Sequence, residues 1–254
     1  MKPVRKEGYQ FCQDVCIPCY QTNGNGVLKP ASFMDLAQEI AYWAAQELGF
    51  GYDTLHIHHT AWVLSRMHVH FHRPVCWRDA VTLYTWHKGS NGLFYLRDFL
   101  LRNAEGERCV SATSSWVVID ERSRRLVRPE ELAELMRLDH AVEDAIAEPA
   151  PKVAFPKGDT RSEPGTTEAA GEHRVVYSDI DILGHTNNAR YVVWAMDCLP
   201  PEAAARPFKD LYINFNKETR LGDTVQLFRL RQENGWLVEG RVDGKSCFVV
   251  QLAE

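Results

Sequence analysis

The sequence predicts an α+β protein made of two copies of one unit, each a curved antiparallel sheet wrapped around a central helix. Three observations support this prediction. Strand-like segments dominate the 254 residues, one helix interrupts them early in each half, and the two halves align with each other. The length is enough for one large domain or two small ones.

Runs rich in Val, Ile, Phe, Tyr and Trp that end at turn residues indicate strands. In the first half we expect strands at 11–20, 61–72, 80–87, 94–102 and 110–120. In the second half we expect them at 174–178, 211–217, 224–232, 236–242 and 246–252. The stretches 103–107 and 243–245 combine glycine with Asn or Asp, which predicts hairpin turns.

Three helices are expected. The first covers 32–48, with Ser32 as its N-cap and a glycine after its last turn. The second begins near Asn187 or Asn188 and ends before the proline at position 200. The third covers 129–138 and has a proline in its first turn.

The halves repeat weakly. "VHFHRPVCWRDAVTL" (69–83) aligns without gaps with "INFNKETRLGDTVQL" (213–227), so that Asp79 meets Asp223 and Pro74 meets Glu218. We therefore expect an N-terminal domain at 1–140 and a C-terminal domain at 172–254. Residues 141–171, rich in Pro, Gly, Ala, Thr and Glu, are expected to be a linker.

Composition excludes several classes of protein. Hydrophobic residues make up 45% and charged residues 25%, as in ordinary globular proteins, and the net charge of −5 does not fit a non-specific nucleic-acid binder. No apolar run approaches the roughly 20 residues of a membrane span, and the N-terminus lacks the apolar core of a secretion signal. Seven scattered cysteines fit reduced thiols, so we expect a cytoplasmic protein.

The most polar chemistry lies in "DIDILGHTNNARYVVW" (179–194), where a strand-like segment passes into a helix. Asn187 and Asn188 suit a helix N-cap, and the free backbone amides there can polarise a substrate carbonyl. Asp181 and His185, four residues apart across a turn, can be directed at one point. A carboxylate can attack a carbonyl or take a proton from water, and a histidine can transfer that proton. The first copy has no histidine or acid at its own strand-to-helix junction, so only the second copy carries a reactive set.

The stretch "SDIDILGHTNNARYVVW" (178–194) resembles the signature of acyl-ACP thioesterases and, more generally, the D-x-x-x-G-H-x-N-N-x-x-Y motif of hotdog thioesterases. Residues 62–86 and 112–132 resemble the N-terminal domain of that family, and "NKETRLGDTV" (216–225) resembles the segment that carries its catalytic acid. The resemblance covers most of the chain. One departure stands out, because many members have Asn where this chain has Leu183.

The resemblance implies two tandem hotdog domains, hydrolysis of fatty acyl-ACP to free fatty acid and ACP, and a role in fatty acid biosynthesis. It implies Asp181, His185 and Glu218 as the catalytic set, with Asp181 as nucleophile or as the base that activates water. Asn187 and Asn188 would contribute to substrate binding. The acyl chain would lie beneath the first helix, along residues Phe33, Met34, Ala37, Ile40 and Ala41. No cofactor or metal is implied, and the chain is expected to be a monomer or a homodimer.

Three alternatives stay open. The same fold can act on acyl-CoA, and a hotdog dehydratase also uses a histidine with an acid. A non-catalytic acyl-binding module is the third alternative, and Leu183 is the residue that favours it.

Three other patterns favour a structural interpretation or a weaker functional one. Cys12, Cys16 and Cys19 have the spacing of an iron–sulfur site, but they lie in a segment that reads as a strand. The histidines at 68, 70 and 72 share one strand face opposite apolar residues, which is typical of a half-buried strand. The stretch 120–128 has four arginines and is most simply a solvated strand end; the alternative is a docking patch for the acidic surface of ACP.

Overall fold

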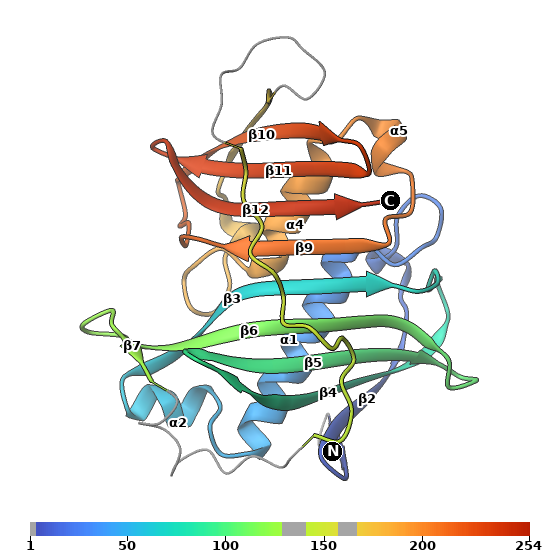
Figure 1. Ribbon diagram of the computed structural model, residues 1–254, viewed down its shortest axis with the longest axis vertical. Coiled ribbons are helices and arrows are strands. Elements are labelled where there is room, and N and C mark those ends of the chain that lie inside the picture. The colour runs from blue at the N-terminus through green and yellow to red at the C-terminus, as the bar shows by residue number, and fades with distance from the viewer. Residues whose placement is uncertain (1–3, 129–140, 157–166) are drawn as a thin grey trace. The chain divides into compact units, whose positions relative to one another are not determined.

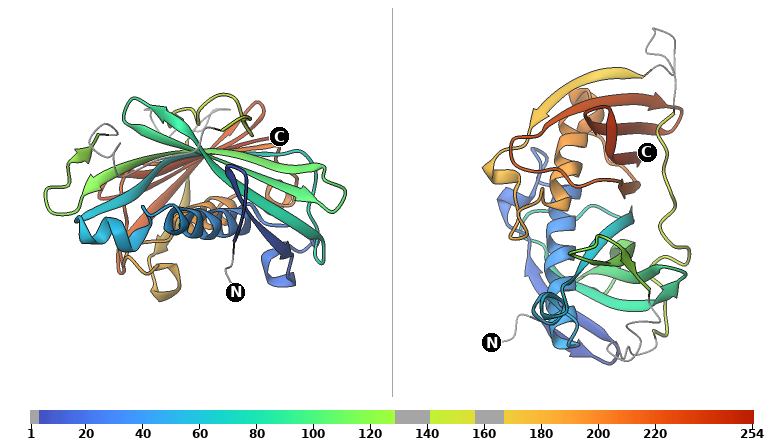
Figure 2. Two further views of the ribbon diagram at one scale, coloured as in Figure 1. Left: turned by 90° about the horizontal axis from the view of Figure 1, so that it is seen from below. Right: turned by 90° about the vertical axis from the view of Figure 1, so that its left-hand side faces the viewer.

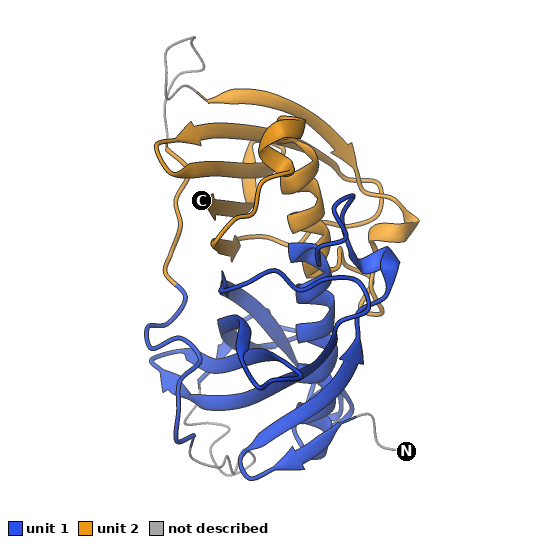
Figure 3. Cartoon of the chain, turned by 90° about the vertical axis from the view of Figure 1, so that its right-hand side faces the viewer, with its two compact units in different colours: residues 1–150 blue, residues 151–254 orange. Residues whose placement is uncertain are grey.

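The computed structural model describes residues 4–128, 141–156 and 167–254, which form two compact units, 1–150 and 151–254 (Figure 3). Each unit is an antiparallel sheet that carries one long helix (Figures 1 and 2). The predicted α+β class is therefore confirmed. The boundary between the units falls inside the segment that we expected to be the linker.

The sheet of unit 1 has the order β1-β2-β4-β5-β6-β3, and the short β7 also pairs with β6. Its strands are β1 (Arg5–Glu7), β2 (Gln10–Cys16), β3 (Thr60–Phe71), β4 (Ala80–Asn91), β5 (Phe94–Asn103), β6 (Arg108–Asp120) and β7 (Leu126–Val127). A single 3-10 turn, η1 (Cys19–Gln21), and the helices α1 (Pro30–Glu47) and α2 (Tyr52–Ile57) lie between β2 and β3.

Helix α1 lies along one face of this sheet (Figure 2). Its buried residues recur at helical spacing, and they include Phe33, Met34, Ala37, Ile40 and Ala41. The helix begins two residues earlier than predicted, because Pro30 occupies its first position and Lys29 is the N-cap. Ser32 is thus a buried helical residue, and its prediction as the N-cap was wrong.

The opposite face of β4 and β5 is covered by the segment 143–147, which crosses the strands (Figure 1). Trp86 Nε1 donates to the Glu143 carbonyl at 3.1 Å, and the Ala145 amide donates to Asp98 Oδ2 at 2.8 Å. Lys88 Nζ donates to the Ile146 carbonyl at 2.6 Å. These contacts explain why β5 is buried on both of its faces.

The sheet of unit 2 has the order β9-β12-β11-β10-β8. Its elements are β8 (Glu168–Arg174), η2 (Tyr177–Asp179), α4 (Asn188–Asp197), α5 (Pro201–Ala204), β9 (Asp210–Phe215), β10 (Thr224–Gln232), β11 (Gly235–Val242) and β12 (Lys245–Ala253). The predicted hairpin at 243–245 is confirmed: Asp243 and Gly244, both with positive φ, connect β11 to β12.

Several predicted strands differ from the structure. The strand expected at 80–87 continues to Asn91 as β4. The strand expected at 174–178 lies earlier, as β8, and the 3-10 turn η2 replaces its end. The strands expected at 11–20 and 211–217 end at Cys16 and Phe215, because the chain turns into the loops that precede the helix of unit 1 and β10. The helix expected at 129–138 lies outside the described residues.

Candidate active site

The loop between η2 and α4 is closed by the backbone and side chain of Asp181. The Asp181 amide donates to the His185 carbonyl at 2.9 Å, and the Asp181 carbonyl accepts from the Gly184 amide at 3.0 Å. Asp181 Oδ1 accepts from the Leu183 amide at 2.9 Å and from the His185 amide at 3.4 Å. Gly184 has φ +76°, a conformation that favours glycine, so the loop relies on this glycine and on a side-chain oxygen at position 181.

Helix α4 begins where the asparagine pair predicts. Asn187 is the N-cap, and its side chain accepts from the Ala189 amide at 2.8 Å. The Asn187 amide donates to the Asp179 carbonyl at 2.8 Å. Within the described part of the chain, the Asn188 amide has no hydrogen-bond acceptor. Of the amides that we expected to polarise a carbonyl, the Asn188 amide is the one left to donate.

A second loop, 216–223 between β9 and β10, is fastened to the first by Thr219, which is completely buried. The Thr219 carbonyl accepts from the Thr186 amide at 3.0 Å, and the two hydroxyl oxygens lie 2.7 Å apart. Tyr191 Oη lies 3.0 Å from Thr219 Oγ1 and accepts from the Thr219 amide at 3.1 Å. This buried hydroxyl network fixes the residues on either side of Thr219 against the first loop.

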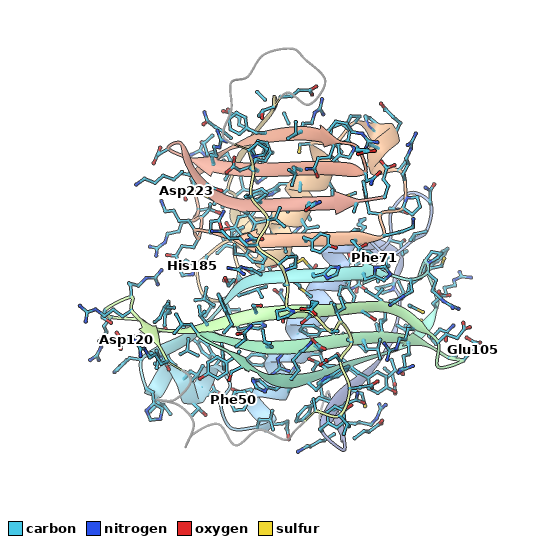
Figure 4. All side chains as sticks on the ribbon, viewed as in Figure 1. Phe50, Phe71, Glu105, Asp120, His185 and Asp223 are labelled. Carbon is cyan, nitrogen blue, oxygen red and sulfur yellow. The ribbon has the colours of Figure 1, made fainter. Side chains whose placement is uncertain are left out.

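The two loops bring His185, Glu218 and Arg220 together. His185 Nε2 lies 3.5 Å from Glu218 Oε2, and Arg220 Nη2 lies 2.9 Å from Glu218 Oε1 and 3.3 Å from His185 Nε2. About 30% of the His185 and Glu218 side chains is exposed, which leaves them accessible to a substrate. Figure 4 labels His185 and Asp223 toward the same end of the unit 2 strands. Glu218 lies in the second loop, after the end of β9.

The carboxylate of Asp181 is directed into its own loop. Among the described residues its hydrogen bonds are those from the Leu183 and His185 amides, and none joins it to the His185 ring or to Glu218. The structure therefore brings the side chains of His185 and Glu218 together. Asp181 is linked to them through the loop that it shares with His185. The catalytic roles of all three stay predictions.

Unit 1 contains the same two loops without the reactive groups. Asn23 takes the place of Asp181: its amide donates to the Val27 carbonyl at 2.8 Å, and its Oδ1 accepts from the Asn25 and Val27 amides at 2.9 and 3.1 Å. Val27 thus occupies the position of His185, and Pro74 that of Glu218 by the sequence alignment.

The second loop repeats in the same way. Asp79 Oδ2 accepts from the Cys76 amide at 2.7 Å, as Asp223 Oδ2 accepts from the Arg220 amide at 2.9 Å. The equivalence of these bonds confirms the internal repeat.

Two features of the site escaped the sequence analysis. Arg220 was overlooked because a charged residue in a polar turn reads as solvated. The second feature is Asp179, which is 4% exposed and accepts from the Val176 amide at 2.9 Å, with His173 Nε2 2.8 Å away. The signal for Asp179 in the sequence was its place as the first acid of the stretch 179–194, two residues before Asp181.

The residues expected to bind the acyl chain lie on the buried side of α1, against the sheet of unit 1. Within the described ranges, no three His, Cys, Asp or Glu side chains are grouped as metal ligands would be. In the same ranges, no helix has both the length and the apolar character needed to span a membrane.

Comparison with known proteins identifies the family. The family model for the acyl-ACP thioesterase N-terminal domain matches residues 8–136, and the model for the C-terminal domain matches residues 162–242. The chain is 26% identical over 238 residues to oleoyl-acyl carrier protein thioesterase 2 of Arabidopsis thaliana, which covers 87% of this chain and 63% of the relative. It is 28% identical over 236 residues to the palmitoyl-acyl carrier protein thioesterase of Gossypium hirsutum, covering 88% and 55%. The chain thus spans less than two thirds of the length of these relatives.

Solved structures confirm the fold. The 12:0-ACP thioesterase from Umbellularia californica superposes with a TM-score of 0.81 at 20% identity, covering 98% of both chains. The putative oleoyl thioesterase from Lactobacillus plantarum gives a TM-score of 0.79 at 22% identity, covering 96% of this chain and 94% of that one. The tandem hotdog prediction is therefore confirmed, and the chain belongs to the acyl-ACP thioesterase family.

Proposed function

We propose that the protein hydrolyses the thioester of fatty acyl-ACP and releases free fatty acid and ACP. The observation that carries the proposal is the His185–Glu218 pair, held beside the Asp181 loop and the start of α4 in the unit that matches the C-terminal domain of the family. Unit 1 keeps the same loops but replaces these groups with Val27 and Pro74, so the chemistry is assigned to unit 2.

Asp181 can act in the hydrolysis in two ways, as a nucleophile or as a base. As a nucleophile, its carboxylate attacks the thioester carbonyl, the C–S bond breaks, and the resulting mixed anhydride is hydrolysed by water. As a base, it takes a proton from water, and the resulting hydroxide attacks the same carbon. In both routes the departing thiolate needs a proton, and His185 is the group that can transfer it.

The neighbouring groups have supporting roles. Glu218 and Arg220 hold the His185 imidazole from one side at 3.5 and 3.3 Å. The Asn188 amide, which has no acceptor among the described residues and lies at the positive end of α4, donates to the carbonyl oxygen as negative charge develops on it. Asn187 supports that donor as the N-cap.

Unit 1 is assigned to the acyl chain. The buried side of α1 offers an apolar surface, formed by Phe33, Met34, Ala37, Ile40 and Ala41. The partner that delivers the chain is ACP, and the four arginines of 120–128, all exposed, are the surface proposed to contact its acidic face. The oligomeric state and the cytoplasmic location stay predictions.

Parallel assays test the proposal. Thiol release is followed with a disulfide dye from acyl-ACP and acyl-CoA that carry the same acyl group, across a panel of chain lengths. We expect a higher kcat/KM on the ACP thioester. Faster hydrolysis of the CoA thioester moves the assignment to an acyl-CoA thioesterase. Tight acyl binding without thiol release identifies a binding module, and an intact thioester with a dehydrated β-hydroxyacyl group identifies a dehydratase.

A further inference from the structure

Arg97 on β5 is a buried cation that pairs with no carboxylate among the described residues. It is 7% exposed, and its Nη1 donates to Thr85 Oγ1 at 3.2 Å. In the described part of the chain that is its one side-chain hydrogen bond, and no carboxylate pairs with it. Burial lowers the pKa of Arg97 to about 10, so the guanidinium keeps its charge at neutral pH. A guanidinium presents several N–H donors, and leaving them without acceptors in a protein interior is costly.

His87 lies directly opposite Arg97 on β4 and adds a second donor. Its Nδ1 accepts from the Gly89 amide at 3.1 Å, which assigns the ring proton of the neutral imidazole to Nε2. Burial and the charge of Arg97 lower the pKa of His87 to about 3, so the ring is neutral at physiological pH. Nε2 is buried and has no hydrogen-bond partner among the described residues.

These donors lie on the face of the sheet that α1 covers. Tyr95, two residues before Arg97 and therefore on the same face of β5, packs in one cluster with Ala45 of α1. Asp98 points to the opposite face, where the Ala145 amide holds it. Five of the nine buried residues of α1 are alanines, so the helix presents mostly short side chains to the strands.

A ligand that lies against Arg97 and His87 must supply hydrogen-bond acceptors for their donors. A methylene chain would leave Arg97 and His87 unsatisfied, whereas a hydroxyl or carbonyl oxygen would accept from them. Sites of this kind discriminate strongly, because the analogue that lacks the oxygen leaves buried donors unpaired.

We propose that Arg97 and His87 form a polar subsite for an acceptor oxygen, a hydroxyl or oxo group, on the acyl chain at a position remote from the thioester. The protein then selects oxygen-bearing acyl groups over plain ones of the same length. The inference rests on the proposed function in one respect, namely that the acyl chain lies against the buried side of α1.

Calorimetric titration with free fatty acids tests the subsite without any need for turnover. The probes are a saturated fatty acid and its isomers with one hydroxyl moved along the chain, together with the matching oxo acids. We expect the isomer that places its oxygen at the subsite to bind about tenfold more tightly than the parent acid. Arg97→Met, which keeps the length of the side chain and removes its donors, should abolish that preference. Arg66→Met is the matched control, since that guanidinium lies over the Phe94 ring and not at the subsite.

Each result of the titration either supports or overturns the proposed subsite. If the parent acid and the oxygenated acids bind equally, wherever the oxygen lies on the chain, the proposed subsite is overturned. The absence of binding by any of the acids overturns it as well. We expect Arg97→Met to fold and to resist heat better without ligand, because it removes an uncompensated buried charge. If that variant does not fold, the comparison of acids on the unaltered protein still decides. Thiol release from acyl-ACP, measured separately, shows whether the proposed hydrolysis fails independently of the subsite.

Discussion

Asp181→Asn separates the structural role of this carboxylate from the catalytic role that we propose for it. The first role is to close the loop, through Oδ1 bonds of 2.9 and 3.4 Å to the Leu183 and His185 amides. Asn23 performs that role in unit 1 with an amide oxygen, at 2.9 and 3.1 Å. An asparagine at position 181 can therefore form the same loop, and the free energy of unfolding should change by no more than about 0.5 kcal/mol.

The second role is chemical, and asparagine cannot perform it. An amide is neither a base nor a nucleophile for a thioester, so kcat should fall by at least about a hundredfold, or roughly 3 kcal/mol in activation free energy. The assay pairs thiol release from acyl-ACP with urea unfolding of the same preparation. Asn23→Asp is the matched control, because it makes the converse change in the equivalent loop and should leave both turnover and stability nearly unaltered.

Two results would refute this reasoning. Near-normal turnover by a folded Asp181→Asn variant would remove Asp181 from the mechanism. Loss of folding in that variant would show that the two loops are not equivalent, despite their matching hydrogen bonds. Asp181→Ala adds a check on the loop, since it removes the acceptor altogether and should cost about 1 kcal/mol of stability.

Further predictions follow from the same geometry. Glu218→Gln, which keeps the shape of the side chain but not its charge, should lower kcat about tenfold to a hundredfold while the urea midpoint stays unchanged. Thr219→Val should lower the free energy of unfolding by about 1–3 kcal/mol, because it leaves the hydroxyls of Thr186 and Tyr191 without their shared partner. Since the pKa of His87 is lowered to about 3 in the folded protein, the unfolded chain binds a proton that the folded chain does not between about pH 6.5 and 3. Stability should therefore fall with acidification in that window, by up to about 1.4 kcal/mol per pH unit, and urea unfolding of His87→Gln across the window should show a flatter slope. Maleimide should label the three exposed cysteines at neutral pH before the four buried ones, as peptide mapping would show, and an even distribution would contradict the burial.

Much of the fold could be predicted because local patterns and tertiary packing agree. The strands β10 and β11 have the bounds expected from composition and turns to within a residue, and the asparagine pair marks the start of α4. Prediction failed where the chain departs from regular structure. The stretch 174–178 has the composition of a strand, but Asp179 accepts from the Val176 amide and stabilises the turn η2 instead.

For the candidate site, the sequence named candidate residues, whose roles stay predictions, but it did not reveal their arrangement. The resemblance named Asp181, His185 and Glu218, but no local pattern reveals that Thr219 fastens the two loops. The polar pair of Arg97 and His87 was also invisible from sequence. The stretch 94–102 reads as an ordinary strand, and only the coverage of its other face by residues 143–147 shows that both faces are buried. That coverage comes from a segment that we expected to be a linker.

Cleavage of the acyl-ACP thioester by this chain can be measured directly. The most direct measurement incubates the purified protein with acyl-ACP and quantifies free ACP thiol and free fatty acid in the same samples over time. We expect the two products to appear in equal amounts, at a rate that Asp181→Asn reduces at least about a hundredfold. Folded protein that releases neither product, or thiol without a matching amount of fatty acid, would contradict the proposed hydrolysis.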